Sequence, residues 1–149
     1  MKIVLFPIAF RKAITFMEKT ILNLTAKMTL TTGASDLDIE RMVLSIPYAL
    51  PEVFLEFLKF SNGVKGRIGN KFLIIWGTND IISINEGYNV KIFAPGLLLF
   101  GSDGGNEGYG FDFRGGKMSI VEIPFICMDW ESAKIISHSF VGFLSYMNE

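Results

Sequence analysis

A short acidic loop carries the residues of this chain that are best suited to chemistry. Asp103, Asn106 and Glu107 stand among five glycines in the segment Gly101–Gly110, which contains no basic residue. Carboxylate and amide oxygens could bind a hard cation such as Ca²⁺, and two carboxylates could act as general acid and base. Glycine-rich backbone could instead present its amide groups to a phosphate.

The spacing of the loop fits neither a calcium site nor a phosphate site. Counted from Asp103, position twelve of an EF-hand loop falls on Arg114, where that motif needs a bidentate glutamate. The chain contains neither G-x-x-x-x-G-K-[ST] nor G-x-G-x-x-G, and two carboxylates would repel a phosphate. With one histidine and one cysteine, the sequence also excludes a histidine-based metal cluster. We expect no metal and no cofactor.

Catalysis by side chains alone is also not expected. A general acid–base pair needs surroundings that separate its two pKa values, and an exposed glycine-rich loop does not provide them. No serine lies in a G-x-S-x-G motif. Cys127 lies in the apolar run Ile123–Met128, so we expect a core thiol rather than a nucleophile. The loop is better suited to meeting a partner, and we expect the protein not to be an enzyme.

Length and charge exclude several other classes of protein. The chain has 149 residues, enough for one domain, and a net charge of −1. Residues 1–30 carry a net charge of +4, which we interpret as a solvated helix face, so we expect no nucleic-acid partner. No apolar run is long enough to cross a bilayer, and the first residues lack a signal-peptide cleavage site. We expect a cytoplasmic protein without a membrane partner, and leave its oligomeric state open.

Hydrophobic periodicity predicts helices in the first part of the chain. Apolar residues recur at spacings of three and four over 10–28, which predicts an amphipathic helix followed by a connector at 29–33. Ser35 can cap a second helix that ends before Pro47. Pro51 suits the start of a third helix, which Ser61-Asn62-Gly63 would end.

The second part of the chain reads mainly as strands. We expect strands at 71–76, 97–100, 109–113, 118–123 and 128–131. A short helix at 80–88 and an extended piece at 90–93 lie between the first two strands, and a closing helix begins after Ser137 or Ser139. Residues 114–117 form a hairpin turn. The predicted fold class is α+β: a mostly antiparallel sheet with N-terminal helices and one C-terminal helix packed on it.

Two aromatic residues complete the expected contact surface. Trp130, between Asp129 and Glu131, is a better candidate for exposure than Trp76, which ends an apolar strand. Tyr109 directly follows the acidic loop. The predicted partner-binding residues are therefore Asp103, Asn106, Glu107, Tyr109 and Trp130.

Two segments of the chain resemble the motifs of the SUKH superfamily. Leu50–Gly63 is similar to the signature LPxxYxxFLxxxNGG, with Phe54 in place of the usual tyrosine and Val64 in place of the second glycine. Gly101–Asp112 is similar to GxDGGGExYxFD. The resemblance begins near Ser35, so we expect a SUKH-like domain over 35–149 and treat 1–34 as its N-terminal helical extension.

The resemblance implies binding rather than catalysis. The superfamily includes bacterial immunity proteins, which neutralise the nuclease or deaminase domain of a toxin, and fungal regulators of cell-wall assembly. It therefore implies an immunity protein that binds a toxin domain, or alternatively a regulatory scaffold linked to cell-wall or glucan synthesis. An acidic loop would complement a basic toxin surface, and the net charge of −5 over residues 31–149 agrees in sign.

Overall fold

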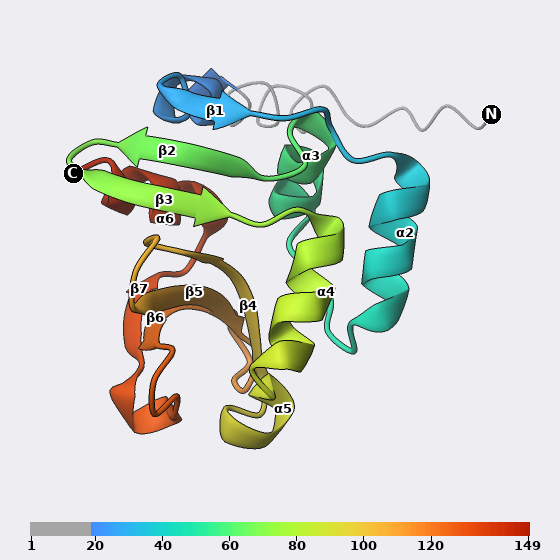
Figure 1. Cartoon of the computed structure of the whole chain (residues 1–149), viewed down its shortest axis with the longest axis vertical. Coiled ribbons are helices and arrows are strands. Elements are labelled where there is room, and N and C mark those ends of the chain that lie inside the picture. Colours follow the sequence, from blue (N-terminus) through green and yellow to red (C-terminus); the bar gives the residue numbers. More distant parts are fainter. Residues whose placement is uncertain (1–18) are drawn as a thin grey trace.

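The computed structural model describes residues 19–149, which contain one seven-stranded antiparallel sheet (Figure 1). Each strand pairs with the next one in the sequence, so the spatial order is the chain order. The strands are β1 (Met28–Leu30), β2 (Val64–Ile68), β3 (Lys71–Ile75), β4 (Leu97–Ser102), β5 (Glu107–Asp112), β6 (Ser119–Pro124) and β7 (Lys134–Ser137).

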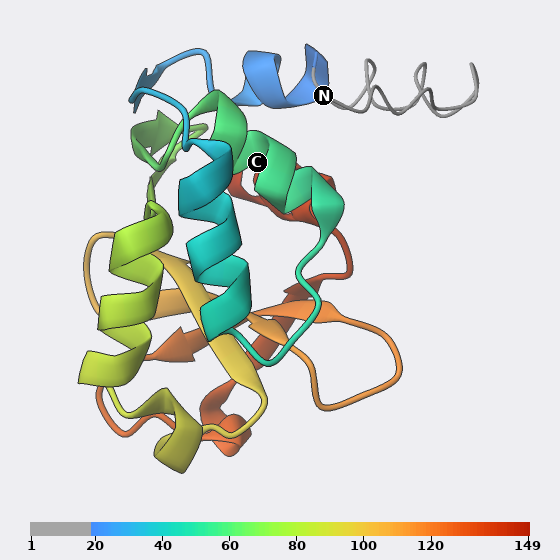
Figure 2. The same ribbon diagram turned by 90° about the vertical axis from the view of Figure 1, so that its right-hand side faces the viewer.

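Helices precede the sheet, interrupt it between β3 and β4, and close the chain. They are α2 (Asp36–Ser45), α3 (Glu52–Phe60), α4 (Thr78–Gly87), α5 (Val90–Phe93), the 3₁₀ helix η1 (Trp130–Ser132) and α6 (Phe140–Met147). Figure 2 shows α2 and α4 side by side, with α3 beside them in front of α6. The predicted α+β class is confirmed. No helix within residues 19–149 is long and apolar enough to cross a membrane.

The main core lies between α3, α6 and one face of the sheet. Phe54 of α3 is fully buried, and its ring lies 5.5 Å from that of Phe100, 5.0 Å from that of Phe111 and 5.3 Å from that of Phe140. A second, smaller cluster on the other face of β4 and β6 packs against Val90 and its neighbours in α5. Side chains alternate along β4, so this strand serves both clusters.

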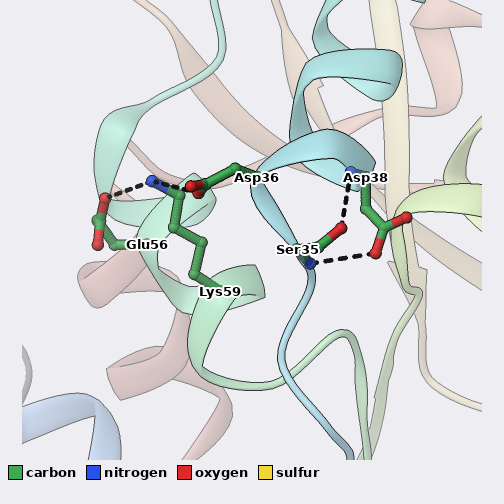
Figure 3. A network of polar contacts seen from close by, with 5 residues as sticks. All are labelled: Ser35, Asp36, Asp38, Glu56 and Lys59. Atoms are coloured by element: carbon green, nitrogen blue, oxygen red, sulfur yellow. Dashed lines mark hydrogen bonds and ion pairs between the residues drawn. The ribbon is translucent and has the colours of Figure 1, made fainter. Parts of the chain in front are cut away.

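Ser35 caps the N-terminus of α2, as the sequence predicts (Figure 3). Ser35 Oγ accepts a hydrogen bond from the Asp38 amide at 3.1 Å, and the Asp38 carboxylate accepts one from the Ser35 amide at 3.1 Å. This capping box lowers the pKa of Asp38, because hydrogen bonds from Ser35 favour the carboxylate. Lys59 of α3 lies 3.8 Å from Asp36 and 3.4 Å from Glu56, so it links the two helices.

The first motif, Leu50–Gly63, serves the scaffold. Asn62 Oδ1 accepts a hydrogen bond from the Thr78 amide at 2.8 Å and thereby caps α4 from a distance. Gly63 has a φ of 99°, and a Cβ there would meet the Ile75 carbonyl oxygen at 2.8 Å, so glycine is needed at this position. The side-chain hydroxyl of Ser61 accepts from the Thr31 amide at 2.9 Å, which ties the segment after β1 to the motif.

The structure corrects several expected elements near the chain's first strand. The predicted helix over 10–28 lies partly outside the described residues; residues 19–24 are helical, and the helix has ended before Met28. The first two residues of the expected connector at 29–33 belong to β1 instead. β1 is a short edge strand that is stabilised by its pairing with β2. Strand β2 was not predicted, because Gly66 and two basic residues interrupt its apolar pattern.

Three further expectations are wrong in the second half. Residues 90–93 form α5 rather than an extended piece, after Asn89 reverses the chain with a φ of 52°. The expected strand at 128–131 runs into η1, and the edge strand begins only at Lys134. Cys127 is exposed, because β6 ends at Pro124 and the chain turns outward, with a φ of 56° at Cys127.

Candidate partner-binding site

The acidic loop is an ordered turn that one carboxylate holds in place. Asp103 Oδ1 accepts hydrogen bonds from the amides of Gly105 at 2.8 Å and of Glu107 at 3.2 Å. Ser102 Oγ accepts from the amide of Gly104, where φ is 81°. Asp103 is only partly exposed, so it both shapes the turn and contributes charge to its surface.

Asn106 and Glu107 lie at the end of this turn. Asn106 is exposed, and its backbone carbonyl accepts a hydrogen bond from the Phe125 amide at 2.9 Å. Glu107 is partly buried at the first position of β5. Partial burial raises the pKa of Glu107, and the nearby charges of Glu122 and Asp103 raise it further.

Glu122 is the residue of this site that the sequence analysis missed. The register of β5 and β6 places it directly opposite Tyr109, and therefore on the same face as Glu107. We call Asp103, Glu107 and Glu122 the acidic rim. Within residues 19–149, none of the three has a basic group within 4.0 Å, in contrast to Asp36 and Glu56 beside Lys59. The sequence shows that Glu122 is a polar residue within an apolar strand, but the residues beside it are fixed only by the register of β5 and β6.

Tyr109 does not belong to the surface of the site, which corrects its predicted role as a contact residue. Its side chain is 4% exposed, and its ring packs 5.1 Å from that of Phe143 in α6. Burial raises the pKa of the Tyr109 hydroxyl, and the charges of Glu122 and Asp103 add to the effect. Tyr109 is thus a neutral part of the core beneath the acidic rim.

Trp130 lies at the other end of the β4–β5 hairpin from the acidic loop. Its Nε1 donates a hydrogen bond to the Pro95 carbonyl at 2.9 Å, just before β4 begins. The Arg114 guanidinium lies 3.5 Å from the centre of the indole ring, just after β5 ends. Strands of this length separate the two ends by about 20 Å. The structure therefore does not bring Trp130 together with Asp103, Asn106 and Glu107.

Arg114 joins Trp130 to the sheet through Asp112. Its Nε and Nη2 donate to the two oxygens of Asp112, each at 3.1 Å. Burial alone would raise the pKa of Asp112, but the hydrogen bonds and charge of Arg114 outweigh burial, and the pKa is lowered. The stabilisation is therefore present above the ordinary aspartate pKa and is lost as the pH falls through the lowered value.

Replacing Arg114 by methionine should lower the free energy of unfolding by about 1–2 kcal/mol, because a half-exposed ion pair and a cation–π contact are lost while the alkyl stem remains. Urea unfolding followed by circular dichroism measures this loss. Lys117→Met, at an exposed position in the same hairpin turn, is the matched control and should change stability by less than about 0.5 kcal/mol. Equal effects of the two substitutions would contradict the structural role of Arg114.

The acidic rim suits binding of a basic surface better than binding of an ion. Within residues 19–149, no group of three or more His, Cys, Asp or Glu side chains is placed to hold a metal ion. The rim carboxylates are instead spread along the turn and across two strands. Such an arrangement presents several acceptors to lysine or arginine side chains of a partner.

Fold and site together define an α+β domain with a seven-stranded antiparallel sheet, covering helices, and an acidic rim formed by the β4–β5 turn and strands β5 and β6. The sequence matches the SMI1 / KNR4 family (SUKH-1) over residues 33–146, and the chain belongs to this family. The comparison with curated proteins found no matching sequence. Both motifs, Leu50–Gly63 and Gly101–Asp112, lie within the matched range.

Proposed function

We propose that this protein is a non-enzymatic binding protein that neutralises a toxin domain by covering a basic surface with its acidic rim. Family membership supports a role at this general level. The superfamily that the motifs resemble includes proteins that bind toxins. The observation that carries the proposal is that none of Asp103, Glu107 and Glu122 forms an ion pair within 4.0 Å in the described part of the chain, although the strand register places Lys134 of β7 opposite Glu122.

The electrostatics of the rim favour a cationic partner. Partial burial raises the pKa of Glu107, and the nearby negative charges of Glu122 and Asp103 raise it further. A lysine or arginine placed between the carboxylates would relieve the repulsion and form charge-assisted hydrogen bonds. Complementary charge would also speed the encounter of the two proteins at low salt.

The proposal is tested with the product of a neighbouring toxin gene, where one is encoded beside the gene for this protein. Neutralising the rim in Asp103→Asn/Glu107→Gln/Glu122→Gln should weaken the complex by about 100-fold or more in calorimetry, and should remove most of its salt dependence. Asparagine at position 103 keeps an oxygen that can accept from the Gly105 and Glu107 amides.

The matched control changes charge equally at another place. Asp80→Asn/Glu86→Gln/Glu131→Gln removes three exposed carboxylates away from the loop and should leave affinity within about threefold. Equal weakening by both triple variants would show a long-range charge effect and would contradict binding through the rim. A neighbouring toxin that neither binds nor is neutralised would exclude that pairing.

Binding through the rim should also depend on pH. A cationic partner favours ionised Glu107, so complex formation releases the proton that the raised pKa retains. We expect the affinity to fall as the pH drops through the raised pKa of Glu107, and the Glu107→Gln variant to show a shallower fall. Calorimetry in buffers of different ionisation enthalpy measures the released proton directly. If the affinities of wild type and of Glu107→Gln changed equally with pH, the involvement of Glu107 would be contradicted.

The alternative, a regulatory scaffold linked to cell-wall or glucan synthesis, predicts a different phenotype. A deletion strain would grow poorly under wall stress in the absence of any toxin. Unaltered growth under wall stress, together with sensitivity to the neighbouring toxin, would favour the immunity function.

A further inference from the structure

A second surface of opposite charge lies on the other face of the sheet. Leu73 and Ile75 of β3 point into the main core, so Phe72 and Ile74 alternate to the opposite face. The β2–β3 register places Lys65 opposite Ile74 and Arg67 opposite Phe72. We call Lys65, Arg67, Phe72 and Ile74 the basic sheet face.

This face is open to solvent in the described structure. Figure 1 shows β2 and β3 with one face toward the viewer and α6 behind them. Lys65 and Arg67 are exposed, Phe72 is 38% exposed and Ile74 is partly exposed. The tip of the acidic loop packs beside this surface, where a Cβ on Gly104 would lie 2.9 Å from the Phe72 ring and 3.9 Å from Ile74 Cδ1.

The charge of this face has one sign. β1, β2 and β3 contain Lys65, Arg67 and Lys71 but no acidic residue. Lys71 is engaged on the core side, where its Nζ donates to the Tyr146 and Glu149 carbonyl oxygens at 3.3 and 3.2 Å. Lys65 and Arg67 have no carboxylate within 4.0 Å among residues 19–149. Two cations without counter-ions thus stand beside an apolar surface.

We propose that the basic sheet face docks an acidic, extended segment of a protein partner, a function that goes beyond neutralisation through the acidic rim. Lys65 and Arg67 are two residues apart on one strand and so lie about 7 Å apart, which is the spacing of alternate carboxylates on an extended peptide. Phe72 and Ile74 supply the apolar surface on which the intervening side chains of such a segment rest.

An acidic peptide fits this face better than a nucleic acid does. Residues 19–149 contain eleven Lys and Arg against fourteen Asp and Glu, so a long polyanion that extended beyond the two cations would meet repulsion. A second copy of this chain is the other source of carboxylates, since α2 and α3 carry more acidic than basic residues.

The test uses the full chain and an eight-residue fluorescent peptide of alternating glutamate and valine. Wild type should bind this peptide in fluorescence anisotropy at low salt, with amide shift changes in β2 and β3 in ¹⁵N-correlated NMR spectra. Lys65→Glu/Arg67→Glu should weaken binding by at least about tenfold. Lys91→Glu/Lys117→Glu makes the same change of net charge at exposed positions elsewhere and should weaken binding by less than about twofold.

The remaining measurements separate this surface from its alternatives. The rim variant Asp103→Asn/Glu107→Gln/Glu122→Gln should keep its affinity for the peptide, so failure of one proposal does not decide the other. Unchanged melting temperatures, or a loss of peptide affinity in Lys65→Ala/Arg67→Ala as well, exclude misfolding as the cause of the weaker binding. The proposal is overturned by absence of peptide binding, by shifts outside β2 and β3, by tighter binding of a thymidine octanucleotide, or by salt-sensitive self-association that Lys65→Glu/Arg67→Glu abolishes.

Discussion

Replacing Phe54 by alanine is expected to lower the free energy of unfolding by about 3–5 kcal/mol, the range measured for large buried aromatic residues. The Phe54 side chain is fully buried, and its ring contacts phenylalanines of β4, β5 and α6 at centroid distances of 5.0–5.5 Å. Loss of the ring therefore opens a cavity where three elements meet. Strand and helix backbones border this cavity and cannot collapse into it without breaking their own hydrogen bonds.

Urea unfolding followed by far-ultraviolet circular dichroism measures this loss. Phe60→Ala is the matched control, because Phe60 lies on the same helix but is 43% exposed, and it should cost less than about 1.5 kcal/mol. Phe54→Leu should fall between the two, since leucine fills part of the space. A Phe54→Ala variant no less stable than Phe60→Ala would show that the aromatic cluster is not the centre of the fold.

The elements that could be predicted from the sequence are those with a local physical cause. Ser35 caps α2 as expected, and α3 begins after Pro51 and ends before the Ser61–Gly63 segment. The expected closing helix is also confirmed, and its apolar residues Phe140, Phe143, Leu144 and Met147 are all buried. Capping and helical periodicity are properties of neighbouring residues, so a single sequence contains them.

The features that the sequence did not disclose depend on pairing between distant segments. β1 has three residues and is defined by its contacts with β2, and neither strand has a strong alternating pattern of its own. Glu122 joins the acidic rim through the register of β5 and β6. Burial of Tyr109 and the attachment of Trp130 to Pro95 likewise follow from packing, which residue type alone does not reveal.

Asn85 marks a place where tertiary structure replaces sheet pairing. β3 and β4 pair at Ile74–Ser102 and Ile75–Gly101, and one more backbone hydrogen bond joins the Trp76 amide to the Phe100 carbonyl at 3.0 Å. The two segments separate beyond this point. The Asn85 amide fills the gap: its Oδ1 accepts from the Leu99 amide at 2.9 Å, and its Nδ2 donates to the Leu99 carbonyl at 2.8 Å. A side chain of α4 thus makes the two hydrogen bonds that a neighbouring strand would make.

Asn85→Ala should therefore lower the free energy of unfolding by about 2–4 kcal/mol. Leu99 is fully buried, so the substitution leaves its N–H and C=O without these partners in the interior. Asn79→Ala, at an exposed position of the same helix, should change stability by less than about 0.5 kcal/mol. Similar losses in the two variants would mean that water replaces the Asn85 amide at no cost.

Asn85→Asp tests the donor separately from the shape of the side chain. Ionised aspartate can accept from the Leu99 amide, but it cannot donate to the carbonyl oxygens of Leu99 and Ile81, which Asn85 Nδ2 contacts at 2.8 and 2.7 Å. Repulsion from these oxygens should raise the pKa of the introduced carboxyl in the folded state, so the variant should be least stable at neutral pH. Protonation restores a donor, and stability relative to Asn85→Ala should rise as the pH falls from about 7 toward about 4. A stability difference between the two variants that does not change with pH would show that Asn85 acts through packing rather than through hydrogen bonds to Leu99.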